Sequence, residues 1–187
     1  MSLRKIIDAD HPEVSTFVSD VFSKHEPMCK VLKLSAEEIS ESLVNVIYSC
    51  CRSGLSCAFT VDHKIVAVAL ALKYDVYKQC AIFGLKPIAT ILKDADILAE
   101  SSDVYLFMIA SRIMNRGYAR QVLDETIELC KRSGYSSMSA DATNIVSQYI
   151  FTHHFRFINQ GIVYFKDYDS FKNIIDTPGV MRVYKTL

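Results

Sequence analysis

The sequence predicts an α+β protein in which a central sheet of about seven strands is flanked by helices. Segments with strand-like and helix-like periodicity follow one another in the order β-α-α-β-β-α-β-α-β-α-β-β across the 187 residues. The strand-like segments 55–61 and 65–74 are separated by a short turn, which predicts an antiparallel hairpin. Between 103 and 133, a buried strand leads through a glycine-containing turn into a helix. These three observations together predict the fold class.

The first elements are a short strand and a capped helix. Weak alternation predicts a strand at Leu3–Ile7. Asp10 and Glu13 have the spacing of a capping box, and Pro12 suits a first helical turn, so we expect a helix to begin here. It should end just before Pro27, because a residue that precedes proline is disfavoured in the α region.

Two more helices are predicted around the hairpin. Ser35 and Glu38 form a second capping box, and Gly54 suits the C-terminus of the helix that they begin. After the hairpin, apolar residues recur at helical spacing from Ala81 to Ala99, with Pro87 expected to kink or break the helix.

The segment 103–133 predicts a binding site for an anion. Val104 to Ala110 is a nearly continuous apolar run, typical of a strand buried on both faces. The helix that follows begins near Ala119 and ends at Gly134. Its N-terminus would present unpaired amides and the positive end of the helix dipole, so we expect a phosphate-bearing ligand there.

The last part of the chain predicts a strand at 137–142, a helix at 144–153 and strands at 158–164 and 180–184. In that helix, Ile145, Tyr149 and Ile150 are expected to face inward. No repeat, low-complexity segment or linker divides the sequence, which predicts one domain spanning 1–187.

Composition and charge argue against several functions. Lys plus Arg equals Asp plus Glu at 21 each, without a basic run, which disfavours a nucleic-acid-binding protein. The longest uncharged apolar run, Ile65 to Leu72, is too short to span a membrane, and the N-terminus has no secretory pattern. The six cysteines form no C-x-x-C pair, so we expect neither a metal site nor disulfides, and a cytoplasmic location.

The element order and the glycine turn resemble those of the GNAT superfamily of acyl-CoA-dependent N-acyltransferases. The resemblance covers essentially the whole chain. It implies a mixed, mostly antiparallel sheet that is splayed at the fourth strand, with acetyl-CoA as co-substrate. The family's turn, Gln/Arg-x-x-Gly-x-Gly/Ala, falls on 114–119: Gly117 and Ala119 match, and Met114 departs.

The resemblance also implies which residues bind acetyl-CoA. The pyrophosphate would lie on backbone amides, to which Met114 contributes as well as an arginine would, and the pantetheine would pair with the fourth strand. The implied pyrophosphate-binding residues are Met114, Asn115, Arg116, Gly117, Tyr118, Ala119 and Arg120, and the implied pantetheine-binding residues are Phe107, Met108, Ile109 and Ala110.

A second motif lies at the end of the first helix. The segment from Phe22 to Met28 is similar to the F-x-x-x-E-P-[LM] pattern of the insect and nematode arylalkylamine N-acetyltransferases. The resemblance implies that Glu26 is the catalytic base, acting through water. A protonated amine, with a pKa near ~10, must lose a proton before it attacks a thioester, and a carboxylate can accept that proton. Alternatively, Glu26 and Pro27 merely end a helix.

A third pair of candidates precedes and begins the helix at 144–153. Many GNAT enzymes have a tyrosine general acid four residues before a Gly-Phe pair, but here these positions hold Ile150 and His154. The insect branch is thought to use two hydroxyl residues four apart, which implies that Thr143 and Ser147 protonate the leaving thiolate. Alternatively, Thr143 caps the helix and Ser147 is a surface residue.

The resemblance therefore implies direct transfer of acetyl from acetyl-CoA to a primary amine in a ternary complex, in a monomer or weak dimer. The segments 22–34 and 81–99 are rich in apolar residues, which favours an aromatic or fatty substrate over a polyamine, and the resemblance implies an arylalkylamine. Two alternatives remain. One is a GNAT enzyme for a polyamine, an amino sugar or a protein N-terminus. The other is a non-catalytic acyl-CoA-binding module, favoured by the departures at Met114, Ile150 and His154.

Overall fold

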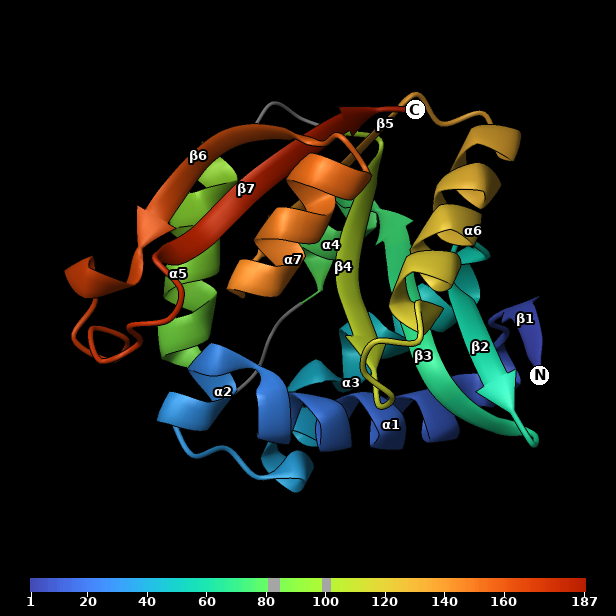
Figure 1. The fold of residues 1–187 in the computed structure, drawn as a ribbon, viewed down its shortest axis with the longest axis horizontal. Helices are drawn as coiled ribbons and strands as arrows, with labels where there is room; N and C mark the ends of the chain where they lie inside the picture. The colour runs from blue at the N-terminus through green and yellow to red at the C-terminus, as the bar shows by residue number, and fades with distance from the viewer. Residues whose placement is uncertain (81–84, 99–101) are drawn as a thin grey trace.

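A seven-stranded sheet organises the computed structural model, which describes residues 1–80, 85–98 and 102–187. The strand order is β1-β2-β3-β4-β5-β7-β6 (Figure 1). The strands are β1 (Ser2–Lys5), β2 (Cys57–Val61), β3 (Lys64–Lys73), β4 (Val104–Ser111), β5 (Ser137–Ala142), β6 (Ile158–Tyr164) and β7 (Gly179–Thr186). Neighbouring strands are antiparallel except β4 and β5, which are parallel. The predicted mixed, mostly antiparallel sheet is confirmed.

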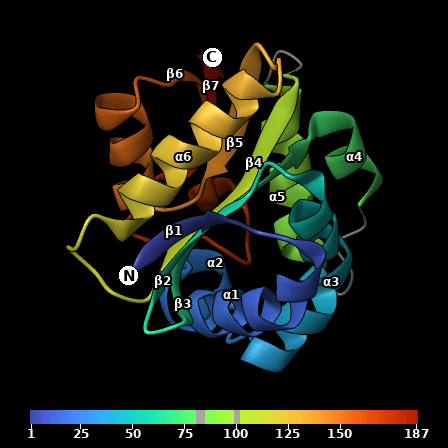
Figure 2. The same ribbon diagram turned by 90° about the vertical axis from the view of Figure 1, so that its right-hand side faces the viewer.

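Helices cover both faces of this sheet. They are α1 (His11–His25), α2 (Pro27–Val31), α3 (Ala36–Ser53), α4 (Tyr74–Gln79), α5 (Lys86–Ile97), α6 (Tyr118–Arg132) and α7 (Ile145–Tyr149). Figure 2 shows α6 on one side of the sheet and α1 and α3 on the other. None of the helices in the described ranges is long and apolar enough to cross a membrane.

The central strand β3 shows how the sequence sets these two layers. Its alternate residues Val68, Leu70 and Leu72 pack in the core with α1 and α3. The residues between them, Ala69 and Ala71, pack in the core with α6, where small side chains allow a helix to approach closely. Both sets are buried, so a one-residue register slip would exchange the two cores.

The sheet opens between β4 and β5, as predicted. These strands pair only from Val104 to Leu106 within the described residues, opposite 138–140. At that point β4 has an extra residue, Phe107, because its register with β3 shifts between Leu70 and Ala71. A bulge of this kind bends a strand. The backbone edge of β4 beyond Leu106 is therefore not covered by β5.

One of the two predicted capping boxes is confirmed, and the other is wrong. Ser35 and Glu38 exchange the expected hydrogen bonds, and Gly54 ends α3 in the left-handed region with φ 74°. Asp10 does not cap α1. Its carboxylate instead accepts hydrogen bonds from the Arg4 guanidinium at 2.6 and 2.8 Å, and Glu13 accepts one from the backbone of β3. Asp10 also accepts a hydrogen bond from the Ile7 N–H at 2.9 Å, so both carboxylates of the predicted box have other partners.

The predicted helix at 81–99 is confirmed from Lys86 to Ile97. Its described part is α5, and Pro87 lies in the first turn, where it neither kinks nor breaks the helix. Residues 81–84 and 99, which the prediction included, lie outside the described residues. Just before them, the strand β3 ends at Lys73, and Tyr74 begins the short helix α4 instead of ending the predicted strand.

The inward face predicted for the helix at 144–153 is wrong for two of its three residues. Ile145 and Tyr149 are 48% and 54% exposed, whereas Ile150 is partly buried against the core, and Gln148 and Phe151 are buried. The Gln148 amide anchors the helix by donating to two backbone carbonyls of β5 and β7, at 3.1 and 2.7 Å. A π-helical turn follows at Ile150–His154, which shifts the face by widening the helix. The sequence pattern alone does not reveal either effect.

Candidate active site

A cavity of about 130 Å³ lies where β4 and β5 separate. Residues from α1, α2, α3, α5, both strands and α7 line it, and most of them are apolar. The lining residues are Phe22, Glu26, Met28, Cys29, Ile39, Leu43, Leu85, Ile88, Leu92, Tyr105, Leu106, Phe107, Met108, Ile109, Ala140, Asp141, Thr143, Ser147 and Phe151. The cavity therefore brings Glu26 together with Thr143 and Ser147, which lie far from it in sequence.

Glu26 enters the cavity because of the proline that follows it. Its N–H donates to the Phe22 carbonyl at 3.0 Å and completes α1, but its own backbone is extended, with ψ 126°, as Pro27 requires. A new helix, α2, starts at Pro27, and the Glu26 side chain caps it by accepting a hydrogen bond from the Cys29 N–H at 2.6 Å. Glu26 therefore ends α1 and also caps α2.

The carboxyl group of Glu26 is buried and only partly satisfied. Oε2 accepts the bond from Cys29, whereas Oε1 is buried without a hydrogen-bond partner among the described residues. Burial raises the pKa of Glu26, and the hydrogen bond from the Cys29 N–H and the nearby hydroxyl of Thr143 oppose this shift in part. A carboxyl group of this kind exchanges a proton nearer neutral pH than a solvated one.

Thr143 and Ser147 also line the cavity. Thr143 lies just beyond β5 and does not cap α7, because the Asn144 side chain accepts a hydrogen bond from the Val146 N–H at 2.8 Å and takes that place. The Ser147 hydroxyl donates to the Asn144 carbonyl at 2.7 Å. Ser147 is partly buried, so the alternative that it is a simple surface residue is not supported.

Beyond the cavity, β4 leads into the turn before α6. Phe107, Met108 and Ile109 line the cavity, and Ala110 is buried and pairs with β3. After Ser111, the turn contains two residues in the left-handed region, Asn115 with φ 58° and Gly117 with φ 73°. The Met114 side chain is 60% exposed, so its departure from the family pattern does not disturb the turn.

Gly117 is the N-cap of α6, and no side chain caps the helix there. The first N–H groups of α6, from Tyr118 to Arg120, have no acceptor within the helix. A Cβ built on Gly117 would meet no described atom within 4 Å, so the space beside this helix end is open. Open space, free amides and the positive end of the helix dipole match the requirements of a phosphate site.

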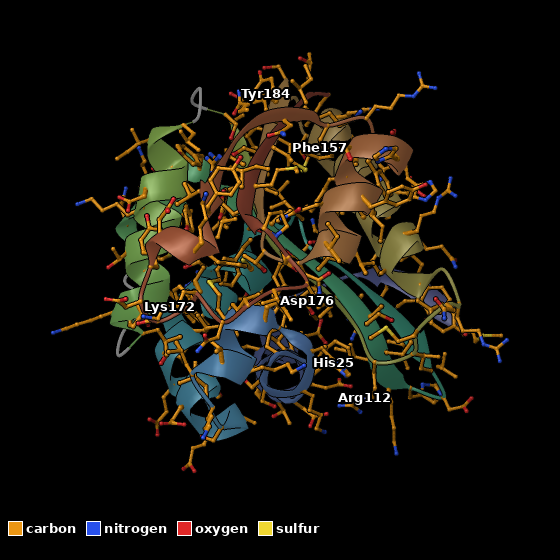
Figure 3. All side chains as sticks on the ribbon, turned by 60° about the vertical axis from the view of Figure 1, so that its left-hand side comes forward. His25, Arg112, Phe157, Lys172, Asp176 and Tyr184 are labelled. Atoms are coloured by element: carbon orange, nitrogen blue, oxygen red, sulfur yellow. The ribbon has the colours of Figure 1, made fainter. Side chains whose placement is uncertain are left out.

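Several arginines lie around this turn. Arg112, which is labelled in Figure 3, follows β4. It donates to Asp20 of α1 at 3.1 Å and lies over the Phe17 ring, so it ties the turn to α1. Arg116 and Arg120 are exposed. Their positive charges add to the anion-binding character of the helix end.

Solved structures resemble the chain over its whole length, although no family profile matches its sequence. The C-terminal condensation domain of Ebony, in complex with β-alanyl-dopamine, has a TM-score of 0.83 at 13% identity, covering 100% of this chain and 98% of that one. Arylalkylamine N-acetyltransferase 2 from Aedes aegypti has a TM-score of 0.78 at 19% identity, covering 99% and 98%. The polyamine N-acetyltransferase of Drosophila melanogaster, which forms N-acetylagmatine, has a TM-score of 0.68 at 12% identity, covering 100% and 99%.

The chain has the GNAT fold. The predicted fold is confirmed. The similar structures include arylalkylamine N-acetyltransferases, the branch that the segment from Phe22 to Met28 resembles.

A buried polar cluster beside the cavity of this GNAT fold was not expected. Arg182 of β7 is fully buried, and its Nη1 lies 3.1 Å from both carboxylate oxygens of Asp141. Its Nη2 lies 3.2 Å from Asp96, and the Tyr105 hydroxyl donates to Asp141 at 2.7 Å. Asp141 lies two residues before Thr143, and both side chains line the cavity. This two-residue spacing, typical of side chains on one face of a strand, is the sequence signal that could have predicted Asp141. No sequence signal predicts the position of Arg182, because it meets Asp141 only through the pairing of β5 with β7.

The cysteines and possible metal ligands complete the site description. All six cysteines are free, and burial raises the pKa of Cys29, so the thiol in the cavity stays protonated. In the part of the chain that the structure describes, no three His, Cys, Asp or Glu side chains gather as a metal site. The groups available for chemistry in the cavity are therefore carboxyl and hydroxyl groups.

Proposed function

We propose that the protein is an N-acyltransferase that transfers the acetyl group of acetyl-CoA to a primary amine, an arylalkylamine. One observation carries the proposal. Glu26 is a buried carboxyl group with a free oxygen, in an apolar cavity at the point where the sheet of a GNAT fold opens. Similar structures named as N-acetyltransferases support the reaction class.

The chain has groups that fit a CoA thioester. Phe107 to Ala110 present a backbone edge that β5 leaves uncovered, to which an extended pantetheine can pair as an added strand. The amides from Asn115 to Arg120 can hold the pyrophosphate, and Gly117 leaves room for it. The thioester would then lie beside the cavity that contains Glu26.

Glu26 acts as the general base in this proposal. It accepts a proton, directly or through water, from the ammonium of the acceptor, and its raised pKa brings it nearer the operating pH. The amine nitrogen then attacks the thioester carbonyl, the C–N bond forms and the C–S bond breaks. Thr143 or Ser147 supplies a proton to the departing thiolate and takes up the proton that the nitrogen loses as the amide forms. No covalent enzyme intermediate is needed, and the protonated Cys29 takes no part.

The charges around the cavity favour a monoamine with an apolar body. Glu26 and Asp141 are the two charged residues among those that line it, and Asp141 is already neutralised by Arg182. One carboxyl group therefore remains for one ammonium, and the remaining wall is mostly apolar. A polyamine would place further charges against apolar side chains, which is costly.

An amine panel tests the proposed function. We expect thiol release from acetyl-CoA with phenethylamine and tryptamine, and release at least about tenfold slower with spermidine and agmatine. Glu26→Ala should abolish most of the release. If no amine supports turnover while CoA still raises the melting temperature, the protein is a non-catalytic acyl-CoA-binding module. If spermidine is preferred, the acceptor is a polyamine.

Gly117 offers a test of the phosphate site. Gly117→Ala should raise the Kd for CoA at least about tenfold, because the new methyl group occupies the phosphate space and strains the turn. Gly134 is a matched control at the other end of α6, with φ 82° and no atom within 4 Å of a Cβ. Both variants should lose roughly 1–2 kcal/mol of unfolding free energy. The Kd for CoA is measured by calorimetric titration. Equal Kd values for Gly117→Ala and Gly134→Ala would contradict a phosphate site at Gly117.

A further inference from the structure

We infer that Phe59 is a positioning residue for the cofactor. Its ring holds Tyr118, and through Tyr118 it holds the turn 112–117, in the conformation that binds CoA. The inference rests on the CoA site of the proposed function and concerns residues outside the cavity. It is carried by the contacts at the two ends of the turn, by the burial of Phe59 and by the backbone conformation of the turn.

The turn 112–117 has little support of its own. All six of its residues are exposed, and Asn115 and Gly117 have left-handed backbones, with φ 58° and 73°. This conformation is unfavourable for a residue with a side chain, and glycine loses much conformational freedom when it is fixed. The ion pair of Arg112 with Asp20 is 51% and 34% exposed, so it is a weak tether. Contacts at the ends of the turn must therefore keep it ordered.

The first end of the turn is attached to a bulge in β3. The register of β2 with β3 shifts after Phe59, which leaves Val66 of β3 as the extra residue. The side chains of Val66 and Ala67 belong to the same core, as expected where a bulge interrupts the alternation of a strand. The Val66 carbonyl accepts a hydrogen bond from the Arg112 N–H at 2.9 Å. The β2–β3 hairpin thus supports the start of the turn.

The same hairpin supports the other end of the turn through Phe59. Tyr118, the first residue of α6, stacks on the Phe59 ring with the centroids 4.5 Å apart and 24° between the planes. Phe59 is 8% exposed and belongs to the core beneath α6, against which Tyr118 packs. After Ser111, Tyr118 is the first residue that is not exposed. The stack is therefore the point at which the turn returns to the core.

This contact fixes the groups that would bind the pyrophosphate. Tyr118 contributes the first free N–H of α6, and Gly117, which precedes it, leaves the open space beside the helix end. If the stack is lost, the turn becomes mobile in the free protein, and CoA must order it on binding. The cost of that ordering appears as a weaker affinity. A stacked aromatic pair contributes enough to change an affinity by about two- to tenfold.

Calorimetric titration with CoA tests the inference without turnover. The Kd is measured for the wild type, Phe59→Leu, Tyr118→Leu, the double variant and Phe157→Leu. Phe157 is a matched control, because it is 3% exposed in the same core and its ring packs against Phe151. Melting temperatures report folding. The KM for acetyl-CoA and the kcat with phenethylamine show whether the change is confined to binding.

Phe59→Leu and Tyr118→Leu should each raise the Kd for CoA by about two- to tenfold. In Phe59→Leu the KM for acetyl-CoA should rise by a similar factor while kcat changes little, because the ring supports binding and not the chemical step. The double variant should bind CoA no more weakly than the weaker single variant, because Phe59 acts through Tyr118. Phe157→Leu should keep the wild-type Kd although its melting temperature falls.

An unchanged Kd in Phe59→Leu overturns the inference, and so does an equal rise in Phe157→Leu. If Phe59→Leu does not fold, Phe59→Met, which also lacks the ring, takes its place in every comparison. Factors that multiply in the double variant would mean that the two rings act separately, which also overturns the inference. A wild type that binds CoA but acetylates no amine overturns the proposed function and leaves this inference standing. A wild type that does not bind CoA overturns both.

Discussion

Replacing Glu26 with glutamine is expected to lower kcat by about 10²- to 10⁴-fold, the usual contribution of a general base. Glutamine keeps the length of the side chain and can still accept the hydrogen bond from the Cys29 N–H that caps α2. The cavity should therefore keep its shape, and the KM for acetyl-CoA should stay close to the wild-type value. Steady-state kinetics with saturating phenethylamine measure the effect.

The pH dependence of kcat/KM shows whether Glu26→Gln loses activity because it lacks a general base. In the wild type, log(kcat/KM) should rise with pH through the raised pKa of Glu26, because the base acts when deprotonated. This acidic limb should disappear in Glu26→Gln. The ionisation of the amine itself, near pH ~10, should remain in both proteins. A variant that keeps the full rate, or keeps the acidic limb, would show that Glu26 is not the base.

The stability of Glu26→Gln should change in the opposite direction to its activity. Because burial raises the pKa of Glu26 above the value of about 4.3 for a free glutamate, the folded state binds its proton more tightly than the unfolded state. The wild type therefore loses stability as pH rises from about 4.3 through the raised pKa. Glutamine does not ionise, so the variant should melt at a higher temperature than the wild type at pH 8 and at a similar temperature at pH 4.

The matched control for these measurements is Glu38→Gln. Glu38 is an exposed carboxylate that caps α3 through Ser35 and has no contact with the cavity. The Glu38→Gln variant should keep the wild-type kcat and should not melt at a higher temperature than the wild type at pH 8. A gain equal to that of Glu26→Gln would mean that general surface charge, and not burial of Glu26, causes the effect.

Replacing Arg182 with methionine is expected to remove about 3–5 kcal/mol of unfolding free energy. The substitution leaves Asp141 buried without its main counter-charge and also frees Asp96 from its contact. Methionine fills much of the volume of arginine, so the loss should come from the uncompensated charge and not from a cavity. Urea unfolding at pH 7 measures it.

Arg132→Met is the corresponding change on the surface. Arg132 lies at the end of α6, forms an ion pair with Glu125 and is 58% exposed. An exposed ion pair of this kind contributes about 1 kcal/mol or less, so the unfolding free energy of Arg132→Met should stay close to that of the wild type. If Arg182→Met loses no more stability than Arg132→Met, the buried cluster is not a structural requirement of the fold.

Local features of the sequence predicted the elements that depend on local physics. The Ser35–Glu38 capping box, the Gly54 helix end and the hairpin at 55–74 each involve residues close in the chain, and each is confirmed. The expected inward face of the helix at 144–153 failed because Gln148 is anchored by β5 and β7, which no local pattern contains. Asp10 failed as a cap for a different reason, since the nearby Arg4 guanidinium and Ile7 N–H bind its carboxylate.

The candidate site also has features that depend on nearby residues and features that depend on distant ones. The amino-acid sequence by itself determined that Glu26 leaves the helical conformation, because Pro27 follows it, and that a glycine turn precedes α6, because both depend on neighbouring residues. Only the tertiary structure decided that Glu26, Thr143 and Asp141 share one cavity. They line the cavity because β4 and β5 separate there, and Asp141 meets Arg182, 41 positions later, only through the pairing of β5 with β7.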